Sequence, residues 1–503
     1  MNSSAETLTE ALAYAAQTWP HNKAMCANQR HWSWHALYIT VERVAGYWHA
    51  LGVKSGDTVG CLTDKSPEVV VAFLACARLG AVFCPINFKL NEKHICDQIA
   101  TANVSVVLTQ ESRTDVLNAI AHSFKKDPLV LSIDTSTATG QHAFWLEVDY
   151  PQSDFVPTPD TVCYLNYTSG STGRPKGAVS THAHILINAR DTIAGLDFHS
   201  EDVFLGMFSV FMHPHELFHR SILVGGAFVI VDSLSPRIIS EQIAHWKVTW
   251  MMAVPSFYEM MIRYRETANH SPDLSSLRLL ESGGAYVSAQ TVKRMETCFQ
   301  ADFIPVWGCT EATGVGLANR SHRESGATGA VIPGYSAKIV DEDGKPLPMG
   351  LVGELIISGP AVVSEYIGQP EESHSAFQDG WYHTGDLMRE IQPGVFQFAS
   401  RRSEMLKVGG IRVFPLEIEQ VIERHPEVSR CVVVGAVEKL RGEVPHAIVQ
   451  RSLNSALDMA TLIQFCAKHL ARFKVPRKVS FWDEIPMLPN GKVDKRRLRE
   501  MLG

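Results

Sequence analysis

Short apolar runs typical of β-strands alternate with helical patterns up to about residue 400, and no other feature constrains the fold as strongly. Val69–Gly80 has the pattern of a buried helix, and Ala81–Cys84 has that of a short strand directly after it. The same alternation predicts strands at Val104–Thr109, Leu129–Ile133 and Phe228–Val231, and helices at Asp115–Phe124 and Ile238–Trp246. Such alternation predicts an α/β fold with a largely parallel sheet.

Two regions depart from this pattern. Gly334–Gly359 contains a polar turn and predicts antiparallel strands. Ser400–Glu404 is a short polar break, which we take as a domain boundary between residues 1–402 and 403–503. Beyond it the sequence predicts a small α+β domain with helices at Pro415–Arg424 and Met459–Arg472 and strands at Cys431–Val437 and Ala447–Gln450. A basic tail follows, in which we expect Lys495–Arg497 to form a solvated face.

Composition excludes several classes of protein. The 503 residues are 45% hydrophobic and 20% charged, which is typical of a globular chain with about three domain-sized units. A net charge of −7 provides no basic field for nucleic acid. The longest apolar runs, such as Val69–Ala77, are too short to span a membrane. Because Met1–Thr9 lacks the features of a secretory signal, we expect a cytoplasmic protein.

The ten cysteines include no CxxC pair, and several lie inside apolar stretches, as Cys76, Cys84, Cys431 and Cys466 do. A buried thiol in such surroundings behaves as a small hydrophobic side chain. We therefore expect all ten to be reduced and structural.

Tyr167–Gly177 is the segment richest in chemistry: three glycines, four Ser/Thr hydroxyls and two cations in eleven residues. Glycines let backbone N–H groups point toward one ligand, and Arg174 and Lys176 add positive charge. The segment therefore predicts a polyphosphate site. It is not a GxxxxGK[ST] loop, because no Gly-Lys-Ser/Thr occurs at the required spacing.

This segment resembles the phosphate-binding motif of the adenylate-forming superfamily, which contains acyl- and aryl-CoA synthetases, peptide-synthetase adenylation domains and firefly-type luciferases. Further motifs continue the resemblance in order from Gly56 to Lys492. It implies a large N-terminal adenylation domain of several subdomains, with parallel sheets flanked by helices and a small β-barrel-like part. A small mobile α+β C-terminal domain that carries the catalytic lysine would follow.

The resemblance implies ATP, Mg²⁺ and coenzyme A as cofactors, and it assigns nucleotide contacts. Trp307–Glu311 matches a motif whose aromatic ring stacks on adenine, whose Thr310 contacts the α-phosphate, and whose Glu311 holds Mg²⁺. Asp386 and Arg401 match residues that bind the ribose, although Ser400 stands where the family has glycine. The remaining implied ATP contacts are Thr168, Ser169, Gly170, Ser171, Thr172, Gly173, Lys176, Gly283, Gly284, Ala285, Gly308 and Lys492.

Two half-reactions follow from the resemblance. Lys492 matches the lysine that bridges the carboxylate and the α-phosphate while the acyl-AMP forms. The C-terminal domain then turns about a hinge, where Ser403 replaces the usual Asp or Lys. Lys407, Gly409 and Gly410 resemble the loop that lines the pantetheine tunnel of CoA ligases.

The acid-binding pocket is expected to be apolar, which suits an acyl or aryl carboxylate. His213 is the candidate gate beside the carboxylate, with a packing histidine as the alternative. Amino-acid-activating members of the superfamily that this chain resembles usually have an Asp near the position of Phe208-Ser209, where it holds the α-ammonium group. No Asp adjoins Phe208-Ser209 here, so an amino-acid substrate is disfavoured, although Glu216 keeps it open. The residues expected to line the pocket are Phe211, Met212, His213, Ser282, Gly283, Val306, Gly308 and Val315.

These observations favour an AMP-forming acid–thiol ligase that joins a small carboxylic acid to coenzyme A. The alternative within the enzymes is an adenylating protein that loads an acyl or amino acid onto a carrier-protein phosphopantetheine in trans. A luciferase-like oxygenase and a purely binding relative are weaker alternatives, since Lys176, Glu311, Asp386, Arg401 and Lys492 are all present. Neither nucleic acid nor a membrane is an expected partner, and a homodimer is one of the open oligomeric states.

Overall fold

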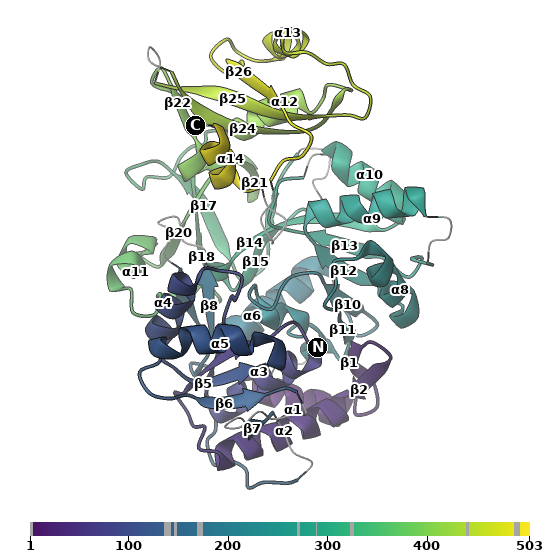
Figure 1. Ribbon diagram of the computed structural model, residues 1–503, viewed down its shortest axis with the longest axis vertical. Coiled ribbons are helices and arrows are strands. Elements are labelled where there is room, and N and C mark those ends of the chain that lie inside the picture. Colours follow the sequence, from purple (N-terminus) through teal and green to yellow (C-terminus); the bar gives the residue numbers. More distant parts are fainter. Residues whose placement is uncertain are drawn as a thin grey trace. The chain divides into compact units, whose positions relative to one another are not determined.

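The computed structural model describes residues 4–134, 142–144, 148–168, 175–268, 272–287, 289–321, 326–438, 442–486 and 493–502. The chain divides into two compact units (Figure 1), and each is described by itself. Unit 1 comprises Met1–Ser321, Gly329–Ser336 and Ile357–Tyr382, and unit 2 comprises His322–Thr328, Ala337–Ile356 and His383–Gly503. The boundary that we place between residues 402 and 403 lies inside unit 2 and remains a prediction.

The first sheet of unit 1 has seven strands in the order β7-β6-β5-β3-β4-β8-β9. All neighbours are parallel except β8 and β9, which form an antiparallel pair. The predicted strand over residues 104–109 is confirmed, and the predicted strand over 81–84 is shifted by one residue. The strands are β3 (Thr58–Leu62), β4 (Val82–Pro85), β5 (Val104–Thr109), β6 (Leu129–Ser132), β7 (His142–Ala143), β8 (Val162–Thr168) and β9 (Lys176–Thr181).

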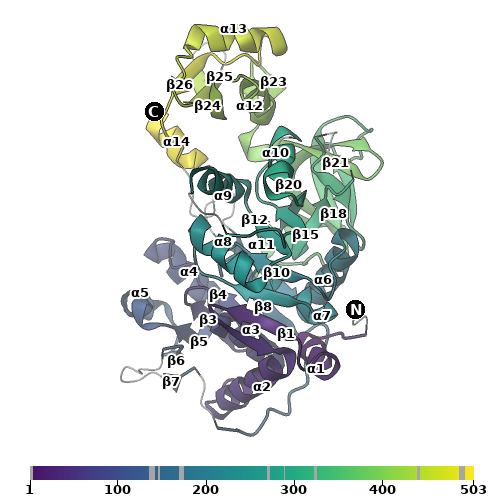
Figure 2. The same ribbon diagram turned by 90° about the vertical axis from the view of Figure 1, so that its right-hand side faces the viewer.

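Helices of unit 1 lie along this sheet (Figure 2), and two of them pack on it through apolar residues that include Ile95, Ile99 and Ile120. The helix predicted over residues 69–80 is α3, and ten of its thirteen residues are buried, which explains its almost continuous apolar sequence. Thr7 caps α1 through a reciprocal capping box with Glu10. The helices of this part are α1 (Leu8–Thr18), α2 (Trp34–Ala50), α3 (Pro67–Leu79), α4 (Glu92–Ala102), α5 (Thr114–Ile120), α6 (His182–Leu196) and α7 (Ser221–Val224).

A second sheet of unit 1 runs in the order β16-β15-β14-β13-β12-β10-β11-β1-β2. Its central strands, from β14 to β1, are parallel, whereas β15, β16 and β2 are antiparallel to their neighbours. The strands are β1 (Lys23–Ala27), β2 (Arg30–Ser33), β10 (Val203–Gly206), β11 (Ala227–Ile230), β12 (Trp250–Ala253), β13 (Leu279–Ser282), β14 (Asp302–Cys309), β15 (Gly314–Ala318) and β16 (Gly329–Val331).

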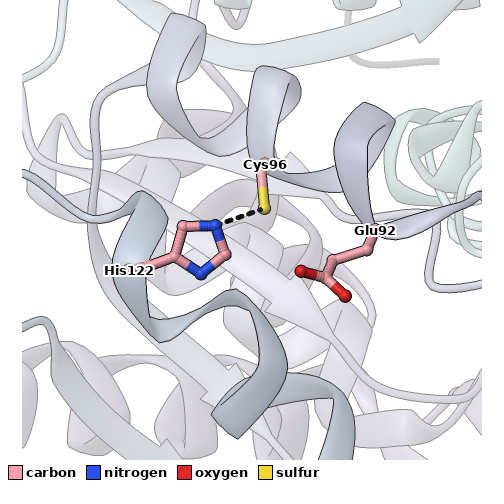
Figure 3. A group of neighbouring side chains, drawn as sticks. All are labelled: Glu92, Cys96 and His122. Carbon is pink, nitrogen blue, oxygen red and sulfur yellow. Dashed lines mark hydrogen bonds between the residues drawn. The ribbon is translucent and has the colours of Figure 1, made fainter.

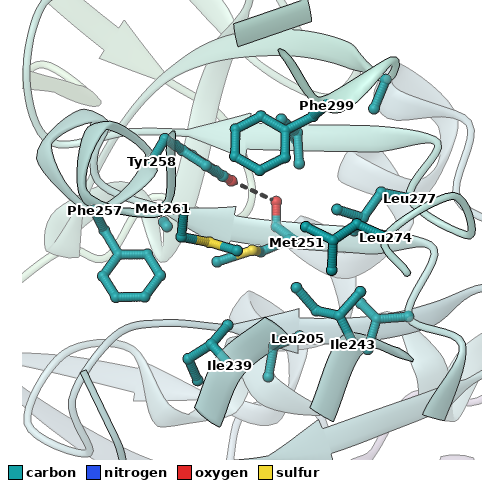
Figure 4. Close-up of a cluster of buried hydrophobic side chains, with 14 of the residues drawn as sticks. Leu205, Ile239, Ile243, Met251, Phe257, Tyr258, Met261, Leu274, Leu277 and Phe299 are labelled. Carbon is teal, nitrogen blue, oxygen red and sulfur yellow. Dashed lines mark hydrogen bonds between the residues drawn. The ribbon is translucent and has the colours of Figure 1, made fainter. Parts of the chain in front are cut away.

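Helices α8 (Pro236–Trp246), α9 (Pro255–Thr267) and α10 (Ala289–Phe299) enclose a large apolar core against the second sheet (Figure 4). Met251 of β12 and Ile243 of α8 are completely buried there. Tyr258 of α9 is also buried, and its hydroxyl donates a hydrogen bond to the Met251 carbonyl at 2.8 Å. Unit 1 also contains α11 (Pro370–Ala376) and β19 (Phe377–Gln378).

Unit 2 begins with strands of the predicted antiparallel region, in the order β17-β18-β20-β21. These are β17 (Ser336–Val340), β18 (Gly353–Ser358), β20 (Trp381–Gln392) and β21 (Val395–Arg401). A five-stranded sheet follows, with β22 (Leu406–Val408), β23 (Ile411–Val413), β24 (Val428–Glu438), β25 (Gly442–Arg451) and β26 (Lys478–Phe481). The predicted small α+β domain is thus confirmed.

Helices cover both faces of this five-stranded sheet. The helices α12 (Pro415–Ile422) and α13 (Met459–His469) pack on one face, and α14 (Lys495–Leu502) packs on the other through the buried Leu498. The prediction that Lys495–Arg497 form a solvated face is wrong for Lys495, because its Nζ lies 2.6 Å from Glu404 Oε2 and only 24% of its side chain is exposed. Periodicity in a short charged run did not reveal this amphipathic helix.

All ten cysteines are free thiols, and seven of them are buried, including the four singled out from their apolar surroundings. Burial raises the pKa of the Cys61 thiol to about 12 and that of Cys466 to about 11. Buried thiols of this kind are inert and structural. The prediction for all ten thus agrees with the seven buried thiols, whereas Cys96, Cys298 and Cys309 are partly exposed. Among the described residues, the helices are all too short or too polar to cross a bilayer.

Candidate active site

Glu311, the predicted Mg²⁺ ligand, lies in unit 1 on the short 3₁₀ turn Thr310–Ala312 that follows β14. Its side chain is buried, and Oε1 accepts a hydrogen bond from the hydroxyl of Tyr366 at 2.7 Å. Its backbone carbonyl accepts a second bond from Val363 N at 2.9 Å. Backbone and carboxylate are both anchored, so the carboxylate of Glu311 has a fixed position.

Tyr366 was not predicted from the sequence, although it connects two predicted site residues. Lys176 Nζ lies 5.2 Å from the centroid of the Tyr366 ring, within the range of a cation–π contact. Burial, followed by the neighbouring Glu311 carboxylate, raises the pKa of Tyr366 well above its ordinary value. Tyr366 therefore stays protonated and donates to Glu311, while its ring face is turned toward a cation.

Thr168 is the last residue of β8 and Lys176 is the first residue of β9, and the two lie opposite each other at the same end of this antiparallel pair. Both are partly exposed. The predicted phosphate contacts Ser169, Gly170, Ser171, Thr172 and Gly173 lie outside the described residues, as does Lys492. The described part of the motif therefore consists of its two flanking strands.

The predicted glycine turn follows β13 at its carboxyl end, beside β14. Ser282 is buried there, whereas Gly284 and Ala285 are exposed. Gly284 has φ of +84°, a conformation that glycine adopts without strain. A Cβ at Gly283 would lie 3.2 Å from a Val306 side-chain carbon, so these two residues, both predicted to line the acid pocket, are neighbours. Carboxyl ends of parallel strands are where open α/β sheets bind ligands.

Trp307 and Gly308 lie on β14 next to β15. The Trp307 ring exposes 8% of its surface and packs beside Gly316. A Cβ at Gly308 would lie 2.4 Å from the carbonyl oxygen of Gly314, so a side chain cannot be accommodated there without moving the backbone. This close approach explains why glycine occupies position 308.

The predicted acid pocket contains more polar atoms than its sequence suggested. Phe211 is buried and makes an edge contact with Phe88, with ring centroids 4.8 Å apart. His213 has φ of +49°, and its Nδ1 lies 3.5 Å from Oε1 of the buried Glu216. A Cβ at Gly314, which precedes Val315, would lie 3.0 Å from the same Glu216 oxygen. Residues predicted for the pocket thus adjoin a buried carboxylate.

Asp386 and Arg401, the predicted ribose contacts, form a cross-strand pair in unit 2. They lie opposite each other on β20 and β21, and Arg401 Nε is 3.2 Å from Asp386 Oδ1. Ser400 is buried next to them, opposite Leu387, and it is not among the described residues with positive φ. The serine that replaces the family's glycine therefore fits an ordinary strand conformation.

A buried glutamate that the sequence analysis missed organises the turn before Asp386. Glu354 Oε1 accepts a hydrogen bond from Gly385 N at 3.0 Å, and Oε2 lies 2.9 Å from His383 Nδ1. Arg402 Nη2 donates to the same Oε2 at 2.7 Å. Because one carboxylate holds both the Gly385 backbone and Arg402, it fixes the segment on which Asp386 lies.

The predicted hinge and pantetheine residues also lie in unit 2. Ser403 is exposed in the 3₁₀ turn Arg402–Glu404. Gly409 and Gly410 form the turn between β22 and β23, with φ of +56° and +84°. Lys407 is exposed on β22, and its backbone N–H donates to Glu443 Oε2 at 3.2 Å. The double glycine is thus required by a left-handed turn.

The order of these motifs corresponds to that of a known family of enzymes. Residues 12–367 match the model of AMP-binding enzymes, and residues 417–492 match the AMP-binding enzyme C-terminal domain. The chain belongs to the AMP-binding enzyme family. The resemblance inferred from the sequence is confirmed, and this AMP-binding enzyme contains both of the family's parts.

Relatives match this AMP-binding enzyme over nearly its whole length. A feruloyl-CoA synthase of an Amycolatopsis species is 30% identical over 490 residues, covering 96% of each chain. The fatty acid–[acyl-carrier-protein] ligase ScoC of Streptomyces coeruleorubidus is 29% identical over 511 residues, covering 98% of this chain and 96% of its own. The solved structure of the anthranilate CoA ligase AuaEII with anthranoyl-AMP has a TM-score of 0.88 at 25% identity, covering 98% and 97% of the two chains.

Proposed function

We propose that this AMP-binding enzyme is an ATP-dependent carboxylic acid–CoA ligase. In the first half-reaction a carboxylate oxygen attacks the α-phosphate of ATP, giving acyl-AMP and pyrophosphate. In the second the thiol of coenzyme A attacks the acyl carbon, giving the thioester and AMP. The observation that carries the proposal is the arrangement around Tyr366. Its hydroxyl donates a hydrogen bond to the buried Glu311 carboxylate, and its ring faces the ammonium group of Lys176.

The first half-reaction brings together two anions, so it needs charge neutralisation around the phosphates. Thr168 and Lys176, which lie opposite each other at one end of the β8–β9 pair, would contact the phosphates, and Thr310 would contact the α-phosphate. Glu311 fits Mg²⁺, because the ion takes one or two carboxylates together with substrate phosphates. When bound, Mg²⁺ would neutralise charge on the leaving pyrophosphate.

Two sets of residues are proposed to contact the nucleoside. Asp386 is an acceptor-only group when ionised, which suits a ribose diol, and Arg401 holds it from the adjacent strand. Trp307 and the Gly283–Ala285 turn would contact adenine. Lys492 is proposed to bridge the carboxylate and the α-phosphate.

The acid is proposed to be an apolar acyl or aryl carboxylate, with His213 at the entrance to its pocket. Support comes from the buried apolar residues Phe211, Val306 and Val315. The feruloyl-CoA synthase relative acts, by its name, on an aryl-substituted acid. We accordingly expect aryl and arylalkenyl acids to be the best substrates in a first panel.

Coenzyme A is the proposed thiol, reaching the adenylate past Lys407, Gly409 and Gly410 after rotation about Ser403. A carrier-protein phosphopantetheine is the second candidate acceptor, favoured by the similarity to a fatty acid–[acyl-carrier-protein] ligase. A cytoplasmic location is also proposed, supported by the free thiols of all ten cysteines. A homodimer stays a prediction that size-exclusion chromatography with light scattering tests.

The proposal is tested with purified enzyme, ATP, Mg²⁺ and a panel of acids. Acid-dependent exchange of labelled pyrophosphate into ATP reports adenylation, and release of AMP on adding coenzyme A reports the second step. Lys492→Ala is expected to lower exchange by several orders of magnitude while largely retaining thioester formation from supplied acyl-AMP. Exchange without release of AMP on adding coenzyme A would favour the carrier protein, and undiminished exchange in Lys492→Ala would contradict the role of the lysine.

A further inference from the structure

Two histidines and a glutamate lie close together in unit 1, and of these three residues the proposed reaction uses only His213. His213, His215 and Glu216 lie at or next to the 3₁₀ turn Pro214–Leu217, within the sequence His-Pro-His-Glu. One ring nitrogen of each histidine and one carboxylate oxygen lie within 4.8 Å of one another. This spacing is compatible with three ligands around a single ion.

His215 is oriented as a metal-binding histidine is. It is completely buried, and its Nε2 lies 2.9 Å from the backbone carbonyl of Thr313. A carbonyl only accepts, so Nε2 carries the proton, and the lone pair of the neutral ring is on Nδ1. That Nδ1 is buried without a hydrogen-bond partner among the described residues. A backbone carbonyl that fixes the second nitrogen is the usual support of a metal-bound imidazole.

Glu216 presents a second buried acceptor without a partner. The residue is 4% exposed, and its Oε2 has no hydrogen-bond partner in the part of the chain that the structure describes. The positive charge of the nearby Arg220 acts on Glu216, but Arg220 donates its hydrogen bonds to both carboxylate oxygens of Glu281, at 2.6 and 3.0 Å. Oε1 of the same carboxyl lies 3.5 Å from His213 Nδ1, so Oε2 is the oxygen left without a donor within the described ranges. A buried carboxylate oxygen without a donor is costly, and a positive ligand beside Oε2 would relieve this cost.

We propose that His213, His215 and Glu216 bind a divalent transition-metal ion of the zinc type. Two imidazole nitrogens and a carboxylate oxygen form a ligand set that suits Zn²⁺, Co²⁺ or Fe²⁺, whereas Mg²⁺ prefers oxygen ligands alone. The ion is therefore distinct from the Mg²⁺ proposed at Glu311. Three protein ligands leave a position open for water or a group of the substrate, and the ion would hold the segment that carries His213.

A second group of possible ligands provides an internal control (Figure 3). Glu92, Cys96 and His122 also lie within 4.8 Å of one another through their ligand atoms. Cys96 Sγ lies 3.7 Å from His122 Nε2. Here Glu92 and His122 are exposed, so water can solvate them without an ion. We expect this surface group to bind a metal ion more weakly than the buried group does. Its Co²⁺ form would also differ in its absorption spectrum, because the thiol of Cys96 would add a thiolate-to-metal charge-transfer band.

The test uses the full chain produced without a histidine tag, stripped with a chelator and dialysed against Zn²⁺ or Co²⁺ at low concentration. We expect about one equivalent of metal per chain by elemental analysis. The Co²⁺ form should show visible d–d bands without a thiolate-to-metal charge-transfer band. His215→Ala and Glu216→Gln should each lower retained metal at least ten-fold, whereas the Cys96→Ser/His122→Ala double variant should retain it.

Three results would overturn the proposal. The first is retention of less than about a tenth of an equivalent by the wild-type chain, a readout that needs no variant to fold. The second is a thiolate charge-transfer band, or loss of metal in the Cys96→Ser/His122→Ala variant, which would place the ion at the surface group. The third is a metal-free enzyme in which Glu216→Gln changes only the preference among acids, which would make Glu216 a contact of the substrate.

Discussion

Tyr366→Phe removes a single hydroxyl and keeps the ring that faces Lys176, so it isolates the hydrogen bond to Glu311. That bond is 2.7 Å long, buried, and made to a carboxylate. A hydrogen bond to a charged group contributes about 1.5–3 kcal/mol. At about 1.4 kcal/mol for each factor of ten, adenylation should slow by about 10- to 100-fold if Glu311 must be held in place to bind Mg²⁺.

Pyrophosphate exchange as a function of Mg²⁺ concentration is the assay. The half-saturating Mg²⁺ concentration should rise while the KM of the acid stays unchanged, since the acid pocket keeps its contacts. Tyr258→Phe is the matched control: its hydroxyl is also buried and donates to the carbonyls of Met251 and Glu281, both at 2.8 Å. The control should lose stability without a change in Mg²⁺ dependence. Less than a three-fold effect of Tyr366→Phe at all Mg²⁺ concentrations would refute the reasoning.

Three further variants test other parts of the account. Asp386→Asn should raise the KM for ATP at least ten-fold by steady-state kinetics, with little change in melting temperature, because its partner Arg401 is 57% exposed and the lost ion pair is weakly stabilising. Arg220→Met leaves the buried Glu281 without its cationic partner, although Trp250 Nε1 still donates to it at 2.9 Å, so urea unfolding should show a loss of about 3–5 kcal/mol, part of which Arg220→Met/Glu281→Leu should restore. Burial lowers the pKa of His182 from 6.5 to about 4, so between these values the unfolded chain binds more protons and stability falls as the pH drops. His182→Asn should reduce the acid-induced fall in the free energy of unfolding by up to about 3 kcal/mol. Urea unfolding measured across this pH range tests this, and an unchanged pH dependence would contradict it.

Local sequence patterns predicted the α/β layers well, because periodicity reports directly which faces are buried. The helix α3 is the best example. Its apolar run leaves no polar face, so the sequence predicts a buried helix in the chain between two strands. Boundaries were less well predicted, as at α13, which ends at His469, three residues before the expected end. At Leu470 the backbone becomes extended, and a periodic pattern does not reveal where this change occurs.

The residues that hold the site residues in place could not be predicted from the sequence, for a different reason. Tyr366 bonds a residue 55 positions earlier in the chain, and Glu354 binds Arg402 across 48 positions. Such contacts are set by the strand order of the folded sheets, and neither residue belongs to a local pattern that singles it out. The sequence indicates only that Glu216 is an acidic residue near the predicted pocket. That its Oε2 is buried without a hydrogen-bond donor among the described residues is a property of the tertiary structure.

Transfer of a labelled oxygen tests the central claim most directly. If an acyl-AMP forms, one carboxylate oxygen becomes the bridge to the α-phosphate and stays with AMP when the thiol displaces it. An acid labelled with oxygen-18 in both carboxylate positions should therefore yield AMP that contains one labelled oxygen, together with unlabelled pyrophosphate and the thioester of coenzyme A. Unlabelled AMP, or label in inorganic phosphate with release of ADP, would contradict the account.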